Sequence, residues 1–343
     1  MSAPRRVLQR SVALLLLIVV VAVGCGGSGN ESARARSLER PDLQRMLRAL
    51  TQKERSGAIA LVETDEGIWR GASGYAERKR RAESEDRFRI ASTTKTFVAT
   101  VVLQLVGEGR LSLDDSVERR LPSRVREGRR ITVRQLLNHT SGLSEDASFA
   151  LAPRNAQPSL LFRPGTAHSY SNVNYVVLGL IVERVTGRRL DRVVRDRLFR
   201  PLGLEQTSYG RAASTALIDR MPAWLGIPEE SRGPVNGAGG IVSTAADLAS
   251  FFRALLGGEL LRDDLLGEMT QTVDTGTEFR AGLGLFRADL PCGSPWGHGG
   301  DDLVYSNQVF ASRDGSTIVV VAQNTTGWPS VEATAEEIYC RSL

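Results

Sequence analysis

Lysine, histidine and cysteine are scarce in this sequence of 343 residues, each occurring only three times. The histidines, His139, His168 and His298, are widely separated and none lies near a pair of cysteines, so the chain contains no recognisable metal-binding motif. It also lacks a glycine-rich phosphate loop and a Gly-x-Ser-x-Gly segment, which excludes the nucleophile elbow of an α/β-hydrolase. We therefore expect an activity that needs neither a metal nor another cofactor.

A large excess of charge of either sign is absent as well. The chain has 44 Lys and Arg residues against 39 Asp and Glu, a formal net charge of +5. Three of the arginines, Arg5, Arg6 and Arg10, lie in residues 1–24, which contain no acidic residue, so the rest of the chain is nearly neutral. Nucleic-acid-binding proteins usually carry a concentrated basic face, and we expect no nucleic-acid partner.

Long hydrophobic runs are missing except near the start of the chain. Residues 12–24 form an uncharged run that is shorter than the roughly 20 residues of a membrane-spanning helix. Because arginines precede it, the run predicts a signal peptide over residues 1–24. Residues 25–37 are small and polar, as expected of a flexible tether.

Cys25 follows Ala22-Val23-Gly24, and this segment resembles a bacterial lipobox. We expect Cys25 to be lipidated and to hold the exported chain on the outer face of the cytoplasmic membrane, with the lipid as its only membrane anchor. A conventional signal with an incidental cysteine, which would give a secreted protein, is the alternative. In either case the oxidising surroundings favour a disulfide between Cys292 and Cys340, with two separate thiols as the alternative. We expect a monomer.

Predicted strands occur near both ends of the chain, and helices dominate its middle. Strands are expected at residues 57–63, 67–75, 281–287, 304–312 and 317–323, and helices at residues 40–53, 96–106, 133–137, 175–185, 190–198, 245–256, 263–269 and 331–339. We predict an α/β (α+β) fold in which residues 38–110 and 235–343 form an antiparallel sheet flanked by helices. Residues 111–234 would form an inserted, mainly helical domain.

Lys95 is unusual in a chain that otherwise relies on arginine for positive charge. A lysine can lose its proton when it is buried, whereas an arginine stays charged. Lys95 follows Ser92 by three residues at the start of an apolar helix, so the two side chains would lie on one helix face. The pair is a candidate nucleophile with its activating base; an N-capping serine followed by a surface lysine is the alternative.

Two further segments contain polar groups that such a nucleophile would need. Tyr170 and Asn172 are two residues apart in a predicted loop and can point into one cleft, although Tyr-x-Asn also occurs in simple turns. His298 is followed by Gly299 and Gly300, and the glycines allow the backbone and the imidazole to approach a ligand closely. A tight turn without a function is the alternative here.

The three segments occur in the order of the active-site motifs of the penicillin-recognising serine hydrolases. The chain resembles this family, which includes class C β-lactamases, D-alanyl-D-alanine carboxypeptidases and related esterases, from about residue 37 to its end. It is most similar to secreted serine DD-carboxypeptidases/transpeptidases. The positions of Cys292 and Cys340 also resemble the cysteine pattern of such an enzyme. Supporting similarity lies in residues 87–95, 103–113, 131–143, 199–202 and 237–252.

The resemblance implies a role for each motif residue. Ser92 would be the nucleophile that forms an acyl-enzyme, and Lys95 and Tyr170 would activate it, with the base at each step left open. The backbone N–H groups of Ser92 and Asp301 would form the oxyanion hole. The remaining motif residues would bind the substrate: Asn172, His298, Gly299 and Gly300.

Four positions differ from the carboxypeptidase pattern or bear on its substrate. Gly299 replaces a Thr or Ser whose hydroxyl would help to bind a substrate carboxylate. Phe286 stands where a carboxypeptidase has a carboxylate-binding arginine, and its neighbour Arg287 is the nearest substitute. Asp301 and Asp302 add negative charge beside the cleft, which disfavours anionic substrates unless these side chains point away or pair with arginine.

The sequence therefore predicts a serine hydrolase that acts through an acyl-serine intermediate on a small peptide, ester or β-lactam. A D-alanyl-D-alanine carboxypeptidase or related cell-wall peptidase that reacts with β-lactams is the first hypothesis, and a serine esterase or β-lactamase of the same fold is the alternative. A catalytically silent lipoprotein that binds cell-wall peptides or β-lactams is the hypothesis without enzymatic activity. The presence of Ser92, Lys95 and Tyr170 together favours an enzyme.

Overall fold

The computed structural model describes residues 36–51, 56–76, 79–145, 158–210, 236–302, 305–325 and 330–343. The predicted signal peptide, Cys25 and almost all of the predicted tether lie outside the described residues, and their roles stay predictions. None of the helices in the described part is long and apolar enough to span a membrane.

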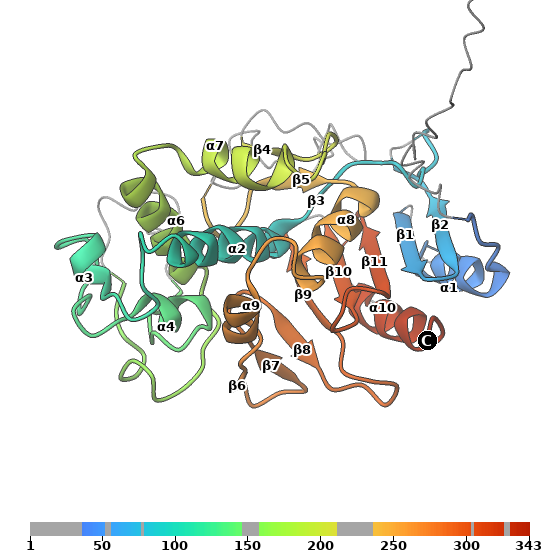
Figure 1. The fold of residues 1–343 in the computed structure, drawn as a ribbon. Helices are drawn as coiled ribbons and strands as arrows, with labels where there is room; N and C mark the ends of the chain where they lie inside the picture. Colours follow the sequence, from blue (N-terminus) through green and yellow to red (C-terminus); the bar gives the residue numbers. More distant parts are fainter. Residues whose placement is uncertain are drawn as a thin grey trace, which may run out of the picture. The chain divides into compact units, whose positions relative to one another are not determined.

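An eight-stranded antiparallel sheet lies at the centre of the fold (Figure 1). Its strands are Gly57–Thr64 (β1), Gly67–Gly74 (β2), Val273–Asp274 (β6), Phe279–Ala281 (β7), Phe286–Ala288 (β8), Trp296–Asp301 (β9), Ser306–Ala311 (β10) and Ile318–Gln323 (β11). In space they follow the order β2-β1-β11-β10-β9-β8-β7-β6. Ala58 of β1 lies opposite Gln323 of β11, so the two ends of the chain complete one sheet, as predicted.

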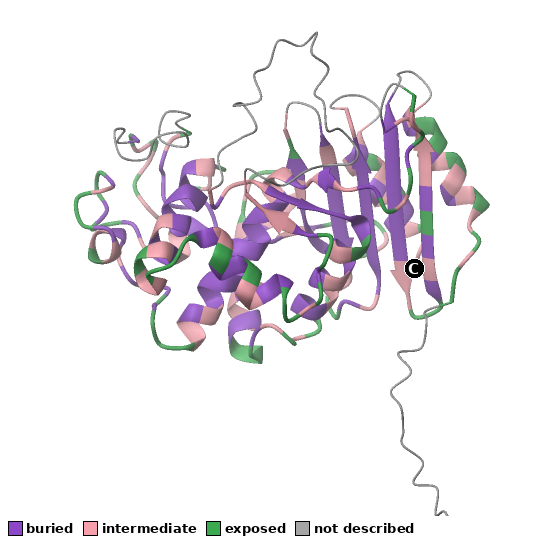
Figure 2. Cartoon of the chain, turned by 90° about the horizontal axis from the view of Figure 1, so that it is seen from above, coloured by how far each residue is buried: buried purple, intermediate pink, exposed green. Residues whose placement is uncertain are grey.

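Helices cover both faces of this sheet. Their bounds are Pro41–Thr51 (α1), Thr94–Gly107 (α2), Val117–Arg120 (α3), Val133–Leu137 (α4), Asn172–Thr186 (α6), Leu190–Val194 (α7), Ala245–Leu256 (α8), Asp263–Met269 (α9) and Val331–Cys340 (α10). Helices α1 and α10 pack on one face, while α2 and α8 share the larger core with the other face. Figure 2 shows the buried residues along the strands and on the helix faces that pack against them.

A smaller sheet and two irregular turns complete the described part. Its strands are Phe88–Arg89 (β3), Ser208–Tyr209 (β4) and Ile241–Ser243 (β5), with β5 in the middle. The turns are Ala91–Thr93 (η1), a 3₁₀ turn directly before α2, and Arg195–Phe199 (η2), a π-helical turn after α7.

Helix α2 is buried nearly all round, as its apolar sequence predicts. Eleven of its 14 residues are buried, including Lys95. The polar threonines are satisfied within the core, since Thr96 Oγ1 donates to the carbonyl of Gly284 at 2.8 Å and Thr100 Oγ1 donates to the carbonyl of Thr96 at 2.8 Å. A helix held this rigidly fixes the position of the side chains at its N-terminus.

One predicted strand is wrong, and strand β9 was not predicted. The single strand expected at residues 281–287 is two strands, β7 and β8, because Gly282 N–H donates to Leu285 at 2.8 Å in a tight turn and Gly284 has a φ of 77°. The glycine-rich segment around His298 belongs to strand β9. There a Cβ on Gly297 would lie 1.8 Å from the carbonyl oxygen of Val309, so glycine allows the two strands to approach.

The middle of the chain is mainly helical in its described part, where α3, α4, α6 and α7 lie. Arg36–Leu343 forms one compact unit, in which these helices and the sheet pack together. The boundaries of the predicted inserted domain stay a prediction.

Cys292 and Cys340 form a disulfide, as the sequence predicts. Their Cα atoms are 5.4 Å apart. The bond joins the loop between β8 and β9 to the last residue of α10.

Candidate active site

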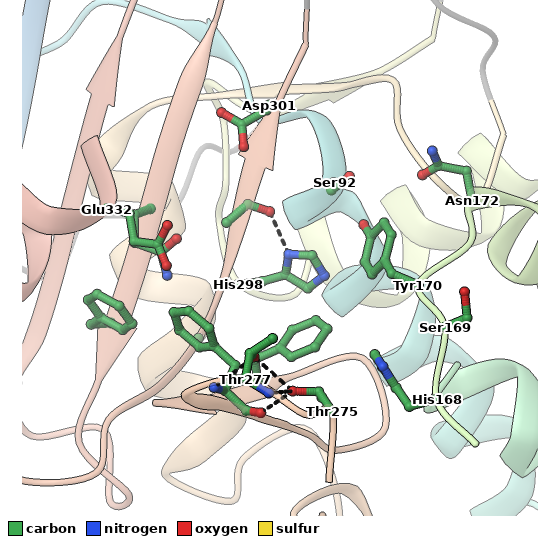
Figure 3. A pocket seen from close by; sticks show the side chains of 16 residues that line it. Ser92, His168, Ser169, Tyr170, Asn172, Thr275, Thr277, His298, Asp301 and Glu332 are labelled. Atoms are coloured by element: carbon green, nitrogen blue, oxygen red, sulfur yellow. Dashed lines mark hydrogen bonds between the residues drawn. The ribbon is translucent and has the colours of Figure 1, made fainter. Parts of the chain in front are cut away.

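A pocket of about 670 Å³ lies where the start of α2, the loop before α6 and strand β9 come together (Figure 3). Strand β8 pairs with β9 only at Trp296 and Gly297, so residues 298–301 have no strand partner on that side. This open strand edge forms one wall of the pocket. Ser92, Tyr170 and Asn172 form the opposite wall.

Ser92 lies in η1, directly before α2. The preceding residue, Ala91, has a φ of 44°, a left-handed conformation that is costly for a residue with a side chain and is typical of functional sites. The following residue, Thr93, donates from Oγ1 to Asn307 Oδ1 of β10 at 2.9 Å. These two features hold the turn, and Ser92 with it, against the central strands.

Lys95 is completely buried beneath Ser92. Its Nζ donates to Ser92 Oγ at 2.9 Å, to Asn172 Oδ1 at 2.7 Å and to the carbonyl oxygen of Ala238 at 3.1 Å. Burial lowers the pKa of Lys95 to about 7, against the opposing effect of the Glu145 carboxylate. A neutral amine is therefore accessible near pH 7, with its lone pair beside the serine hydroxyl.

Tyr170 faces both Ser92 and Lys95 from the other side. Lys95 Nζ lies 4.9 Å from the centroid of its ring, and Figure 3 shows its hydroxyl pointing toward Ser92. Burial raises the pKa of the Tyr170 phenol, and the nearby Ser92 hydroxyl opposes this rise. Tyr170 is 39% exposed, so solvent moderates the effect of burial on its pKa. Because the shift is upward, the phenol stays protonated at neutral pH. Tyr170 can thus give a proton to a leaving group.

His139 supports the ring of Tyr170, which the sequence did not indicate. The two rings stack with centroids 4.4 Å apart. His139 Nδ1 accepts a hydrogen bond from the backbone N–H of Ser171 at 3.3 Å and faces Asn174 Nδ2 at 3.0 Å. Burial and the charge of Lys95 hold the pKa of His139 well below its usual value, so this histidine is a neutral packing partner.

Asn172 is positioned by a second residue that sequence reasoning missed, Glu145. The Glu145 carboxylate accepts from the backbone N–H of Asn172 at 2.6 Å and from its Nδ2 at 2.9 Å. With Nδ2 held in this way, Asn172 Oδ1 points at Lys95. No motif marks Glu145, because it lies 27 residues before Asn172 and meets it only in the folded chain.

His298 lies on the open edge of β9 and is 3% exposed. Its Nδ1 is 2.5 Å from the carbonyl oxygen of Gly299, which can only accept, so Nδ1 carries the proton. Nε2 has no hydrogen-bond partner among the described residues. Burial and the charge of Lys95 lower the pKa of His298 to about 3, so the ring is neutral and Nε2 is an acceptor.

The other predicted residues of β9 have different surroundings. Gly299 and Asp301 line the pocket. Gly300 packs toward η1, where a Cβ would lie 2.1 Å from the carbonyl oxygen of Ile90. The Asp301 carboxylate accepts from Ser306 Oγ at 2.5 Å.

The suggested substitute for a carboxylate-binding arginine is not in the pocket. Phe286 lines it, whereas Arg287 Nε donates to Asp289 at 3.1 Å. Arg89 pairs with Asp302 over 2.7 Å, so the charge of Asp302 is compensated. Within the described part of the chain, no arginine or lysine lines the pocket and no cluster of His, Cys, Asp and Glu could hold a metal ion.

The chain is similar in sequence to several curated proteins. A putative penicillin-binding protein, PbpX of Bacillus subtilis, is 27% identical over 78% of this chain and 70% of its own length. A D-aminopeptidase of Brucella anthropi is 29% identical over 71% of this chain and 51% of its own. A putative D-alanyl-D-alanine carboxypeptidase of Escherichia coli is 26% identical over 58% of this chain and 59% of its own. The chain thus spans only about half to two thirds of several of these relatives.

Solved structures share the whole fold. The crystal structure of a D-stereospecific amidohydrolase from Streptomyces sp. has a TM-score of 0.75 and 33% sequence identity, and the match covers 88% of this chain and 98% of the other. The model of the Beta-lactamase family matches residues 38–340, which include every described motif residue. The chain belongs to this family of β-lactamase-like serine hydrolases.

Proposed function

We propose that this protein hydrolyses an amide bond of a small peptide or amino acid amide through an acyl-enzyme on Ser92. The observation that carries the proposal is the hydrogen bond of 2.9 Å between Ser92 Oγ and a buried Lys95 whose pKa is lowered to about 7. This pair supplies a nucleophile and a base in contact.

The proposed steps use the groups that the site brings together. Neutral Lys95 takes the proton of Ser92 Oγ while that oxygen attacks the substrate carbonyl carbon. The N–H groups of Ser92 and Asp301 are proposed to stabilise the resulting oxyanion. When the C–N bond breaks, Tyr170 donates its proton to the leaving nitrogen and recovers one from Lys95. Water then attacks the acyl-enzyme by the reverse proton path and releases the acid.

Two forms of this activity are candidates. The sequence favours a D-alanyl-D-alanine carboxypeptidase that also reacts with β-lactams, and the carboxypeptidase relative supports this form. An amidase or aminopeptidase is the second candidate. It is favoured by the lining of the described pocket, which offers no cationic side chain for a substrate carboxylate, and by the D-aminopeptidase and amidohydrolase relatives.

Intact-protein mass spectrometry tests the acyl-enzyme. The exported protein is incubated separately with benzylpenicillin, a D-Ala-D-Ala peptide, a D-amino acid amide and p-nitrophenyl acetate, and Ser92→Ala is the control. We expect a covalent adduct that Ser92→Ala lacks and turnover of at least one amide. Ester turnover without amide cleavage would assign an esterase, and no adduct with any compound would indicate the silent binding protein.

We also propose that the protein is exported and anchored by lipid on Cys25, as a monomer. The basic start, the short apolar run and the lipobox-like segment support this location. Cell fractionation of the Cys25→Ser variant tests it, since loss of the lipid should move the protein from the membrane fraction to the soluble exported fraction.

A further inference from the structure

The space beside Gly299 is filled by the side chain of Gln308. A Cβ on Gly299 would lie 2.5 Å from Gln308 Oε1. Gln308 is 6% exposed, and its Nε2 donates to the carbonyl oxygen of Val309 at 3.2 Å, which leaves Oε1 as the atom directed at Gly299. At this point of the pocket the chain therefore presents a hydrogen-bond acceptor, which cannot bind a carboxylate oxygen.

Negative charge lies on the same side of the strands. In the β9–β10 register Gly299 is opposite Gln308 and Asp301 is opposite Ser306, so Asp301 and Gln308 share one face. Glu332, in the first turn of α10, completes the lining there. Burial raises the pKa of Glu332, and the nearby carboxylates Glu336, Glu278 and Asp301 raise it further. A bound cation would relieve this repulsion.

His298 gives an independent indication of a ligand. Its Nε2 is a buried acceptor without a partner among the described residues, and the side chain lines the same pocket. Buried polar atoms are nearly always hydrogen-bonded in proteins, so a lone acceptor that faces a pocket points to a donor supplied by a ligand. Figure 3 shows His298 between Tyr170 and the side where Asp301 and Glu332 lie.

The apolar part of the lining is aromatic. Phe279, Phe286 and Phe310 line the pocket together with the acceptors. Aromatic faces also attract cations and repel anions, so they add to the same preference.

We propose that this pocket selects a substrate with a protonated amine and without a free carboxylate, such as an amino acid amide or a short peptide amide with a free N-terminus. The proposal rests on the acyl-serine hydrolysis proposed above and selects its amidase form. Asp301, Glu332 and Gln308 bind the ammonium group on the α10 side of strand β9, and His298 Nε2, on the other face of β9, accepts from a substrate N–H across the open strand edge. An anionic substrate would meet two carboxylates and two acceptors, and none of the described lining residues would compensate its charge.

Four forms of one dipeptide test the proposal: D-Ala-D-Ala amide, its N-acetyl derivative, D-Ala-D-Ala with a free carboxylate, and N-acetyl-D-Ala-D-Ala. We expect kcat/KM to be at least about tenfold higher for the cationic amide than for each other form, and lowest for the anion. Raising the salt concentration from about 0.05 M to about 0.5 M should reduce the advantage of the cation. Equal rates, or a preference for the anion, would overturn the proposal while leaving acyl-serine hydrolysis intact.

Glu332→Gln distinguishes charge recognition from general damage to the site. We expect KM for the cationic amide to rise about tenfold, with little change in its kcat. For the N-acetyl amide, we expect little change in kcat or in KM. Glu337→Gln, on the exposed side of the same helix, is the matched control. It should change kcat and KM for neither amide. An equal effect of Glu332→Gln on both amides would overturn the proposal. If p-nitrophenyl acetate acylates Ser92 but none of the four dipeptides is cleaved, the proposed amide hydrolysis itself fails.

Discussion

Lys95 Nζ donates a hydrogen bond to Ser92 Oγ over 2.9 Å while the lysine side chain is completely buried. The desolvated ammonium loses its proton near pH 7, and Ser92 is the only hydroxyl-bearing side chain that receives a bond from it among the described residues. This one contact supports both proposed roles, Ser92 as the nucleophile and Lys95 as its base.

Lys95→Arg should strongly slow acylation, although it keeps the positive charge. Arginine cannot release its proton at neutral pH, so the rate of Ser92 acylation is expected to fall by a factor of about 10² to 10⁴. Stopped-flow measurement of the acylation burst with an activated ester checks this. Lys79→Arg, at an exposed position, is the matched control. A normal burst in Lys95→Arg would refute the role of Lys95 as the base.

The pH dependence of kcat/KM should report the pKa of Lys95. Activity requires the neutral amine, so kcat/KM should rise with pH and level off above about 7. The negative charge of Glu145 raises the pKa of Lys95. Glu145→Gln removes this charge and should therefore move the rising part of the kcat/KM profile to lower pH. Glu66→Gln, in the exposed turn between β1 and β2, should leave the profile in place. A shift of the Glu145→Gln profile to higher pH would contradict this account.

The free energy of unfolding should decrease in acid partly because of His298. Its pKa is about 3 in the folded protein and about 6.5 when unfolded, so only the unfolded chain takes up this proton between these values. Stability from this group is therefore full above pH 6.5 and decreases as the pH falls toward 3. Urea denaturation gives the free energy of unfolding at each pH between 6 and 4. Plotted against pH, this free energy should rise less steeply for His298→Gln than for the parent protein, by about 1.4 kcal/mol per pH unit. Identical slopes in both proteins would contradict a neutral, buried His298.

Loss of the disulfide should lower stability without abolishing the site. The bond closes a loop of 48 residues, and its removal in Cys292→Ser/Cys340→Ser is expected to cost about 2 to 4 kcal/mol. Chemical denaturation should give the same free energy of unfolding for the variant and for the reduced parent protein. Titration of two free thiols in the native protein would show that the bond does not form.

Sequence patterns predicted most of the fold because these elements depend on neighbouring residues. The β1–β2 hairpin, the all-round apolar helix α2, and the helices Val133–Leu137, Ala245–Leu256 and Asp263–Met269 follow from local periodicity. The single strand expected at residues 281–287 was wrong, because a tight turn at residues 282–285, with Gly284 at a φ of 77°, divides it into β7 and β8.

The sequence by itself determined the proposed catalytic pair: Ser92 and Lys95 are three residues apart at the start of α2, and that spacing places both side chains on one helix face. Only the tertiary structure decided what surrounds them. Glu145 meets Asn172 across 27 residues, His139 stacks on Tyr170 across 31, and Gln308 reaches Gly299 through the pairing of two strands. Strand register and chain crossing set these contacts, and local patterns do not encode them. The proposed preference for a cationic substrate therefore depends on the folded pocket, whereas the proposed catalytic pair can be read from the sequence.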